Sequence, residues 1–295
     1  MASGARSGGN LFTRQSQHGV RVWAHRGGGH EGPSSVIRTM RETLDKHPGV
    51  ALELDLQRTA DNEIVVFHDA KVDNLTDNRG PVRSFTYDQL RVMDPCYWWT
   101  PGAIFDHDAT DFPLRGKARS DSTLRIPRLI DVLRAFPNTT ISLDLKAGGM
   151  ERTVAAILQE TGTEDNVVVQ SFSESRVQGF RRVAGRTATG GGVRRALWLS
   201  VAPQVGTSPD AGGHALVSPP ERIGPLRLPK FVVDALHRKN LGVHVWTVND
   251  LAMLDYLLKI GVDGIVTDVP SHIVPVVQEY NASLDLSDPG RDSLS

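Results

Sequence analysis

Three absences limit what this chain of 295 residues can be. Cys96 is the only cysteine, so the chain can form no disulfide with itself, as is typical of proteins from a reducing compartment. No apolar run approaches the roughly 20 residues needed to span a bilayer, so we expect no transmembrane segment and at most peripheral membrane contact. The formal net charge is −1, so no excess of basic residues predicts nucleic-acid binding.

Both ends of the sequence are polar. Residues 1–20 are rich in Gly, Ser and Arg and lack the apolar core of a secretory signal. We therefore expect a flexible N-terminal segment over 1–20, a disordered tail over 281–295 and a cytoplasmic protein. Residues 21–280 suffice for a single α/β barrel domain, a fold of about 250 residues, and need not form two domains.

Strand-like apolar runs alternate with segments of helical apolar spacing across residues 21–280. This order predicts βα units around a parallel sheet, and we expect a TIM (β/α)8 barrel. The sequence offers nine candidate strands for the eight strand positions of such a barrel. The candidate before Pro219 is the weakest, because it is short and is followed by two prolines. The candidate strands are Val22–Ala24, Ala51–Leu56, Ile64–Phe67, Thr140–Leu145, Val167–Gln170, Ala196–Ser200, Ala215–Ser218, Val243–Val248 and Gly264–Thr267. The expected helices are Ser34–Lys46, Pro127–Phe136, Glu151–Glu160, Glu174–Val183, Pro229–Lys239 and Asp250–Ile260.

A turn-rich stretch over residues 76–123 interrupts this alternation directly after His68. Long excursions of this kind are usually lids or binding loops, so we expect an insertion on the active-site side of the barrel. Its Tyr97-Trp98-Trp99 run fits either an acyl-chain groove or ordinary loop packing. The triplet Gly190-Gly191-Gly192 is interpreted as a loop.

Chemically useful side chains stand at the ends of three early apolar runs. His25 ends the first run, Glu53 and Asp55 end the second, and His68 follows the third. In a parallel barrel, catalytic groups gather at the C-terminal ends of the strands. Two histidines can exchange protons near neutral pH, and paired carboxylates can hold a hard divalent cation. These are the parts needed to cleave a phosphodiester.

A second charged pair, Asp144 and Lys146, alternates with leucines as Glu53 and Asp55 do. Residues i and i+2 of a strand share a face, so the leucines would pack under helices and the charges would point into the barrel. Buried charges are costly unless they are paired or bind a metal. The three acids therefore predict a Mg²⁺ or Ca²⁺ site beside the lysine. Arg26 would either bridge carboxylates or clamp a phosphate oxygen through its forked donors.

The ordered set of motifs resembles the glycerophosphodiester phosphodiesterase family, and the match spans about Val22 to Tyr280. Any one of these motifs is weak, but the set in this order is highly specific. The motifs are His25-Arg26-Gly27, Glu53-x-Asp55, His68-Asp69, Asp144-x-Lys146, Ser171-Phe172, Val245-Trp246-Thr247-Val248-Asn249 and Gly261-Val262-Asp263-Gly264-Ile265-Val266-Thr267-Asp268. The resemblance implies a TIM barrel of the phospholipase C-like phosphodiesterase type.

The resemblance also implies roles for single residues. It makes His25 and His68 the acid and base, and it makes Glu53 and Asp55 ligands of a divalent cation. Asp144 takes the place of a third acidic ligand that is usually a Glu in the family.

Two further residues would contact the substrate by the same resemblance, and Arg26 is the third candidate for substrate binding from its own chemistry. Lys146 stands at the phosphate-facing position of the family. Trp246 corresponds to an aromatic wall beside the substrate alcohol, although a core tryptophan is an equally good interpretation.

One position departs from the family pattern. The family carries Pro-Glu-Asn-Thr shortly after its first histidine, and that Glu helps to build the metal site. In this chain Ser34 stands at the Glu position, and Glu31 lies at a different offset. The change would alter metal affinity or geometry, or weaken the enzyme.

Three functions are therefore open. The resemblance favours a metal-dependent phosphodiesterase for glycerophosphodiesters, or for lysophospholipids, since residues 126–146 look closer to the lysophospholipase D-type branch. A sphingomyelinase D-like phospholipase shares the histidines and the Asp-x-Lys pair, but those enzymes lack the arginine after the first histidine and are disulfide-linked. A barrel that binds a phosphate or lipid ligand without turnover is supported only by Ser34.

Overall fold

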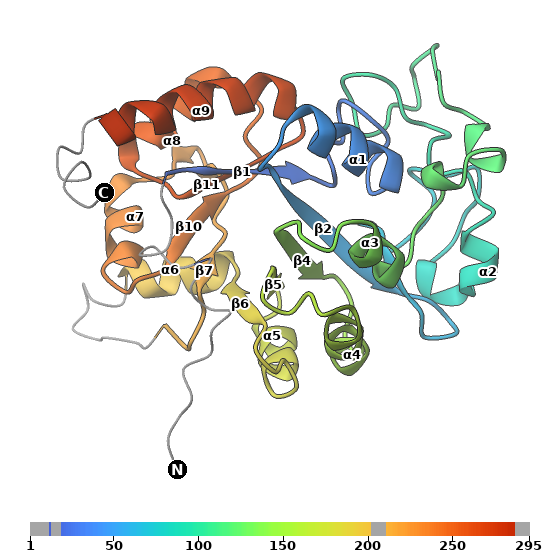
Figure 1. The fold of residues 1–295 in the computed structure, drawn as a ribbon, viewed down its shortest axis with the longest axis horizontal. Helices are drawn as coiled ribbons and strands as arrows, with labels where there is room; N and C mark the ends of the chain where they lie inside the picture. Colours follow the sequence, from blue (N-terminus) through green and yellow to red (C-terminus); the bar gives the residue numbers. More distant parts are fainter. Residues whose placement is uncertain (1–11, 13–18, 202–210, 287–295) are drawn as a thin grey trace, which may run out of the picture.

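The structure is a computed structural model, and it describes residue 12 and residues 19–201 and 211–286. Its parallel strands are β1 (Arg21–His25), β2 (Ala51–Arg58), β4 (Ile141–Leu145), β5 (Val167–Gln170), β6 (Ala188–Gly191), β7 (Leu216–Val217), β10 (Gly242–Val245) and β11 (Gly264–Thr267). These eight strands close into a barrel, because β1 pairs with both β2 and β11 (Figure 1). The predicted TIM barrel is confirmed.

Leucines and charges face opposite sides of the barrel wall along β2 and β4. Leu52, Leu54 and Leu143 belong to the large cluster that packs the strands against the outer helices. A separate cluster, which includes Trp23, fills the interior of the barrel. The register of the two strands sets Asp55 beside Asp144. The alternation thus turns the charged residues inward, as predicted.

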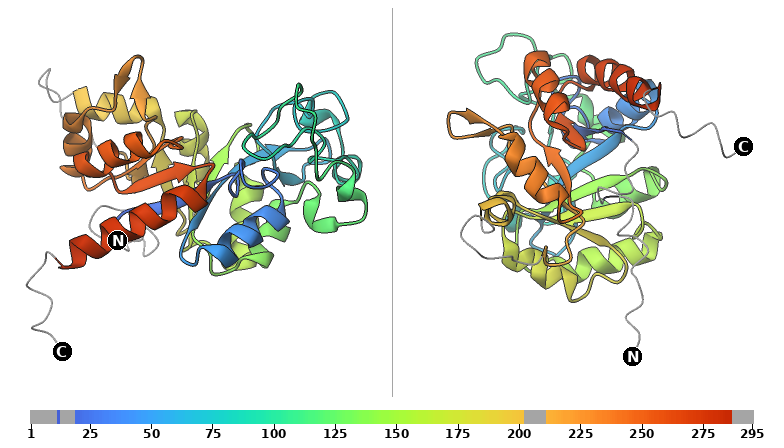
Figure 2. Two further views of the ribbon diagram at one scale, coloured as in Figure 1. Left: turned by 90° about the horizontal axis from the view of Figure 1, so that it is seen from above. Right: turned by 90° about the vertical axis from the view of Figure 1, so that its left-hand side faces the viewer.

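Helices cover the outside of the barrel in the views of Figures 1 and 2. All six segments with predicted helical spacing contain a helix, within a few residues at each end. Asp250 caps α8, because its carboxylate accepts a hydrogen bond of 2.8 Å from the Met253 amide. The helices are α1 (Ile37–Lys46), α3 (Leu129–Ala135), α4 (Glu151–Thr161), α5 (Glu174–Arg181), α6 (Val193–Val201), α7 (Lys230–His237), α8 (Leu251–Ile260) and α9 (Pro270–Leu286).

Three strand predictions need correction or comment. The run Ala196–Ser200 lies in α6, where Ala196 and Leu199 form its buried face. Ile64–Phe67 supplies β3 (Ile64–Val66), which pairs antiparallel with β2 and takes no place in the barrel. The run before Pro219, the weakest candidate, supplies β7.

The sequence does not predict the barrel strand β6, because its run of glycines is typical of a loop. A Cβ atom on Gly190 would come within 2.8 Å of the Leu216 side chain, so the close packing of neighbours requires glycine there. A strand whose neighbours pack this closely has small residues in place of the β-branched residues that favour strands. Its sequence therefore gives little indication of a strand.

The two ends are more ordered than expected in the parts that the structure describes. Residues 281–286 belong to α9 and not to a disordered tail, and Asn281 holds both the backbone N–H and the carbonyl of Val20. Phe12, in the segment expected to be flexible, is buried against Trp23. The rest of 1–18 and residues 287–295 lie outside the described residues.

The stretch 76–123 forms an insertion after β3, and it makes the right-hand end of the molecule in Figure 1. It contains α2 (Tyr87–Leu90) and two short 3-10 helices, Val82–Ser84 and Lys117–Arg119, and a third, Ser122–Leu124, overlaps its end. Trp99 is buried and donates a hydrogen bond of 3.2 Å to the Gly29 carbonyl, which fixes the insertion to the loop after β1. The Trp98 indole donates to the Thr76 carbonyl, and Tyr97 stacks on a guanidinium. Trp99 therefore packs as a core residue, whereas Tyr97 and Trp98 are only half-buried.

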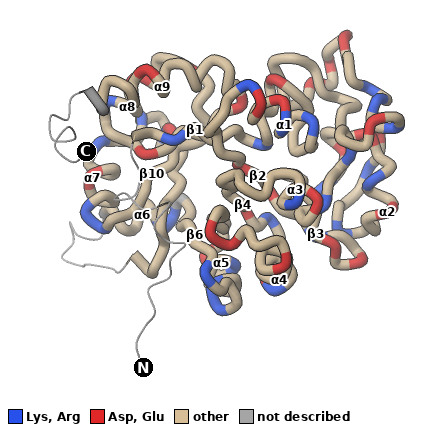
Figure 3. The backbone as a smooth tube through the Cα atoms, viewed as in Figure 1, with Lys and Arg blue, Asp and Glu red and all other residues tan. Residues whose placement is uncertain are grey.

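A short hairpin, β8 (Arg222–Ile223) and β9 (Leu226–Arg227), follows β7. Acidic and basic residues are interspersed over the helices and loops (Figure 3). Among the described residues, no helix combines the length and the apolar composition needed to cross a membrane.

The buried floor of the barrel gives a prediction for stability against acid. His244 packs against Trp23, and burial lowers the pKa of His244 to about 3, although Asp263 partly opposes the shift. The unfolded chain binds this proton near pH 6.5, so between pH 6.5 and pH 3 acid favours the unfolded state. Between pH 7 and pH 5 we expect this group to remove about 2 kcal/mol from the free energy of unfolding.

Urea unfolding at the two pH values measures the effect. His244→Gln cannot bind the proton, so its free energy of unfolding should fall between pH 7 and pH 5 by about 2 kcal/mol less than that of the parent. Equal losses in the two proteins would show that His244 binds its proton equally in the folded and unfolded states.

Candidate active site

One cavity at the C-terminal end of the barrel brings together every site residue predicted from the sequence. It encloses about 690 Å³ of empty space, part of it open to solvent. The predicted residues that line it are His25, Arg26, Glu53, Asp55, His68, Asp144, Lys146 and Trp246. They come from the end of β1 and the residue after it, from the middle of β2, from the end of β4 and the residue after it, and from the residues that follow β3 and β10.

His25 ends β1 and is held by a carboxylate from the other end of the chain. Its Nδ1 lies 2.6 Å from Oδ1 of Asp268, and Oδ2 of Asp268 accepts a hydrogen bond of 2.9 Å from Asn249. Burial would raise the pKa of Asp268, but the hydrogen bond and charge of His25 outweigh burial and the pKa is lowered. An ionised Asp268 can only accept, so it holds the Nδ1 proton and leaves Nε2 for the cavity.

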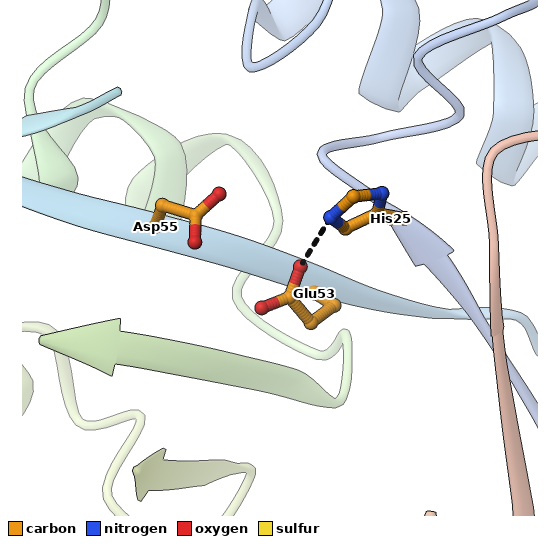
Figure 4. Close-up of side chains that lie close together, drawn as sticks. All are labelled: His25, Glu53 and Asp55. Atoms are coloured by element: carbon orange, nitrogen blue, oxygen red, sulfur yellow. Dashed lines mark ion pairs between the residues drawn. The ribbon is translucent and has the colours of Figure 1, made fainter. Parts of the chain in front are cut away.

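The cavity-facing nitrogen of His25 approaches the acidic residues. Its Nε2 lies 3.8 Å from Oε2 of Glu53, and Figure 4 shows Glu53 and Asp55 projecting from β2 toward the imidazole. The imidazole therefore borders both the acidic cluster and the open part of the cavity.

His68 has the same arrangement of partners. Its Nδ1 lies 2.5 Å from Oδ1 of Asp69, and Oδ2 of Asp69 accepts a hydrogen bond of 2.7 Å from Asn74. Burial alone would raise the pKa of Asp69. The hydrogen bonds from His68 and Asn74 outweigh the effect of burial, so the pKa of Asp69 is lowered. Each histidine is thus oriented by an ionised aspartate, which in turn is oriented by an asparagine.

Sequence reasoning did not identify these supporting residues as a group. Asp268 and Asn249 belong to motifs that resemble the family, but the motifs alone assign them no role, and Asn74 has no sequence signal of its own. Asp268 is 243 positions from His25, so only the closure of the barrel shows that they meet.

Two cations neutralise part of the acidic cluster. Lys146 Nζ lies 2.9 Å from Oδ1 of Asp55 and 2.7 Å from Oδ2 of Asp144, and Arg26 Nε lies 3.4 Å from Oδ2 of Asp55. Burial alone would raise the pKa of Asp55. The positive charges of Lys146 and Arg26 outweigh the effect of burial, so the pKa of Asp55 is lowered. Burial alone would lower the pKa of Lys146. The negative charges of Asp55 and Asp144 outweigh the effect of burial, so the pKa of Lys146 is raised.

The surroundings of the other two carboxylates, Glu53 and Asp144, disfavour a negative charge. Burial and the neighbouring Asp55 raise the pKa of Glu53 well above its usual value. Burial also raises the pKa of Asp144, although Lys146 partly opposes the shift. Three acids facing two cations would therefore be stabilised by one more positive charge.

A second observation supports a divalent cation in this acidic cluster. Glu53 Oε2, Asp55 Oδ2 and Asp144 Oδ1 are buried and accept no hydrogen bond from the described part of the chain. Carboxylate oxygens are the ligands that Mg²⁺ and Ca²⁺ prefer. Ligand atoms of Glu53, Asp55 and His25 lie within 4.8 Å of one another, and Asp144 lies outside this group. Of the three acids expected to bind metal, Glu53 and Asp55 therefore form a close pair, and Asp144 lies beside them.

Glu31 does not take the place of the family glutamate that is Ser34 in this chain. The Glu31 carboxylate accepts hydrogen bonds of 2.7 and 2.6 Å from the backbone and hydroxyl of Ser271, at the start of α9. Ser34 is buried, and its hydroxyl has no hydrogen-bond partner within residues 19–201 and 211–286.

Trp246 combines the two interpretations that the sequence left open. It packs against the cluster that fills the barrel, and its indole donates a hydrogen bond of 2.8 Å to the Ser218 carbonyl. It also lines the cavity, where Phe172 meets it edge-on with ring centroids 5.5 Å apart.

Comparison with known proteins identifies the family. Glycerophosphodiester phosphodiesterase of Bacillus altitudinis is 25% identical over 271 residues, which cover 88% of this chain and 99% of that protein. The enzyme of the same name from Bacillus subtilis strain 168 is 27% identical over 289 residues, which cover 94% of this chain and 92% of the relative.

Solved structures share the fold. Glycerophosphodiester phosphodiesterase from Agrobacterium tumefaciens C58 superposes with a TM-score of 0.66 at 21% identity, covering 87% of this chain and 99% of the other. A phosphodiesterase from Oleispira antarctica, solved with the product sn-glycerol-3-phosphate, gives a TM-score of 0.68 at 17% identity, covering 88% and 97%. Residues 25–272 match the glycerophosphoryl diester phosphodiesterase family as a whole, and the chain belongs to that family.

Proposed function

We propose that this chain is a metal-dependent phosphodiesterase that hydrolyses glycerophosphodiesters or lysophospholipids to an alcohol and glycerol phosphate or lysophosphatidic acid. One observation carries the proposal: two histidines, each oriented by an ionised aspartate, share a cavity with a buried cluster of three acids. The histidines can move protons at neutral pH, and membership of the family supports the reaction class.

The acidic cluster would hold the cation. Glu53 and Asp55 supply the closest oxygens, and Asp144 supplies a third across the strand register. When bound, Mg²⁺ or Ca²⁺ polarises a phosphoryl oxygen and neutralises developing charge. Arg26 and Lys146 add positive charge at the same end of the cavity.

The two histidines then divide the proton transfers. His25 takes the proton from the attacking oxygen, which belongs either to water or to the substrate's own glycerol hydroxyl, with a cyclic phosphate in the second case. His68 gives a proton to the alcohol oxygen as its bond to phosphorus breaks. Asp268 and Asp69 keep each imidazole in the tautomer that presents Nε2 to the substrate.

Choline release from glycerophosphocholine and from lysophosphatidylcholine tests the function directly, each with Mg²⁺, Ca²⁺ or EDTA. We expect cation-dependent release that His25→Ala lowers about 100-fold or more, because the variant has lost a proton carrier. His272→Ala, which removes an exposed imidazole on α9, is the matched control and should act like the parent. No release from either substrate would instead favour a barrel that binds without turnover.

The aspartate behind His25 gives a sharper prediction. Asp268→Asn keeps the size of the side chain but replaces the accepting carboxylate, so the imidazole loses its preferred tautomer. We expect kcat to fall about tenfold or more while KM changes less than about threefold, because Asp268 does not line the cavity. Asp255→Asn, at an exposed site on α8, should change neither constant. A rise in KM with unchanged kcat would show that Asp268 serves binding instead.

A further inference from the structure

The insertion over residues 76–123 contacts the two turns that follow the cavity histidines. One turn follows His25 at the end of β1, and the other comes shortly after His68, which itself follows β3. Two adjacent tryptophans of the insertion, Trp98 and Trp99, each donate an indole hydrogen bond to one of these turns. Both bonds go to backbone carbonyls, so one short segment holds two loops that are far apart in the sequence.

Asn74 lies within a compact turn after His68. The backbone N–H groups of Leu75 and Thr76 both donate to the Val72 carbonyl, at 3.3 and 3.0 Å. The turn is closed at its start by these two bonds, and its later carbonyls remain for partners outside it. The direction in which the Asn74 side chain leaves the backbone is therefore set by the position of this turn.

Two side chains of the insertion hold the later part of that turn. The Trp98 indole donates a hydrogen bond of 3.1 Å to the Thr76 carbonyl. His107 Nε2 lies 3.3 Å from the Asn74 carbonyl, which can only accept, and the His107 ring packs against Trp98 with centroids 4.6 Å apart. The path to His68 is short, because Asn74 binds the aspartate that binds this imidazole.

An arginine fixes Trp98 from within the insertion. The Cζ atom of Arg115 lies 5.0 Å from the centroid of Trp98 and 3.7 Å from that of Phe112. Arg115 also lies over Tyr97, and its Nε donates a hydrogen bond of 2.8 Å to the Tyr97 carbonyl. These contacts hold the indole of Trp98 in one orientation although it is only half-buried.

Trp99 holds the turn after His25 in a similar way. The backbone N–H groups of Gly28 and Gly29 both donate to the His25 carbonyl, so this turn starts at the histidine itself. The buried Trp99 indole donates a hydrogen bond of 3.2 Å to the Gly29 carbonyl. A Cβ atom on Gly29 would lie 3.4 Å from Oδ1 of Asp268, the oxygen that faces His25 Nδ1. Trp99 therefore fixes the turn that borders the pair of His25 and Asp268.

We infer that Trp98 is a positioning residue for His68 and that Trp99 is a positioning residue for His25. Neither tryptophan is among the residues that line the cavity, so each acts through a backbone carbonyl and not on the substrate. The insertion thereby sets how the two proton carriers lie relative to each other. The inference goes beyond the proposed function, and it rests on that function for the separate roles of the histidines.

Two leaving groups distinguish the two tryptophans. The choline of glycerophosphocholine must be protonated as it leaves, whereas the p-nitrophenyl ester of glycerol phosphate releases a stable phenolate that needs no proton. Both substrates need a base for the attacking oxygen. Single-turnover rates record bond cleavage without product release. The variants are Trp98→Phe and Trp99→Phe, with His68→Ala and His25→Ala as references and Trp198→Phe, exposed on α6, as the matched control.

Trp98→Phe should slow choline release about tenfold and p-nitrophenol release less than about threefold, because only protonation of the leaving group is impaired. Trp99→Phe should slow both reactions about tenfold, because both need the base. KM should change less than about threefold in either variant, and the control should act like the parent. Each tryptophan variant should thus share the profile of the histidine that it positions.

NMR of the histidine rings gives a second readout that needs no turnover. Long-range proton–nitrogen spectra report the tautomer and the surroundings of each imidazole. Trp98→Phe should shift the ring signals of His68 and leave those of His25, and Trp99→Phe should do the reverse. Trp198→Phe should shift neither.

Equal effects on both histidines, or on neither, would overturn the inference, because a merely structural role of the tryptophans predicts no such division. His107→Leu, at an exposed site, removes the second hydrogen bond to the turn of Asn74 and should reproduce the profile of Trp98→Phe. It decides the matter if a tryptophan variant does not fold. If the parent cleaved neither ester but the selective NMR shifts were present, the proposed function would fail and the positioning roles would stand.

Discussion

The burial of three carboxylates against only two cations is the constraint on which the rest of this active site depends. Lys146 bridges Asp55 and Asp144, and Arg26 lies beside Asp55, yet burial still raises the pKa of Glu53 well above its usual value. A proton on Glu53 or a bound cation would each relieve this imbalance, and the buried carboxylate oxygens that accept no hydrogen bond within the described residues fit the cation. The site is thus arranged to receive positive charge among the acids and a phosphate beside them.

The barrel supplies this arrangement through plain features of its wall. Alternation along β2 and β4 sends leucines under the helices and acids into the interior, and the strand register sets Asp55 beside Asp144. The end of β1 and the residues after β3 then bring one histidine each to the same mouth. Closure through β11 delivers Asp268 to His25, so the proton carrier and its support come from opposite ends of the chain.

The sequence was informative where chemistry and strand pattern coincide. The motifs predicted the barrel, and the eight site residues that they marked all line one cavity together with other residues. Charges between leucines and histidines after apolar runs are rare without a reason. The sequence failed where packing decides the structure. The run Ala196–Ser200 is apolar enough for a strand but forms the buried face of a helix, and β6 is a strand made of small residues. Asn74 and Trp98 acquire meaning only from the partners that the fold brings to them.

The most direct test of the central claim is anomalous diffraction from crystals soaked in Mn²⁺, an ion with the oxygen preference of Mg²⁺. The account predicts a peak within about 2–2.5 Å of carboxylate oxygens of Glu53 and Asp55, and its loss in Glu53→Gln. An acidic cluster without a peak at saturating Mn²⁺, in crystals of an active enzyme, would contradict it, because the excess negative charge would then be balanced without a bound cation.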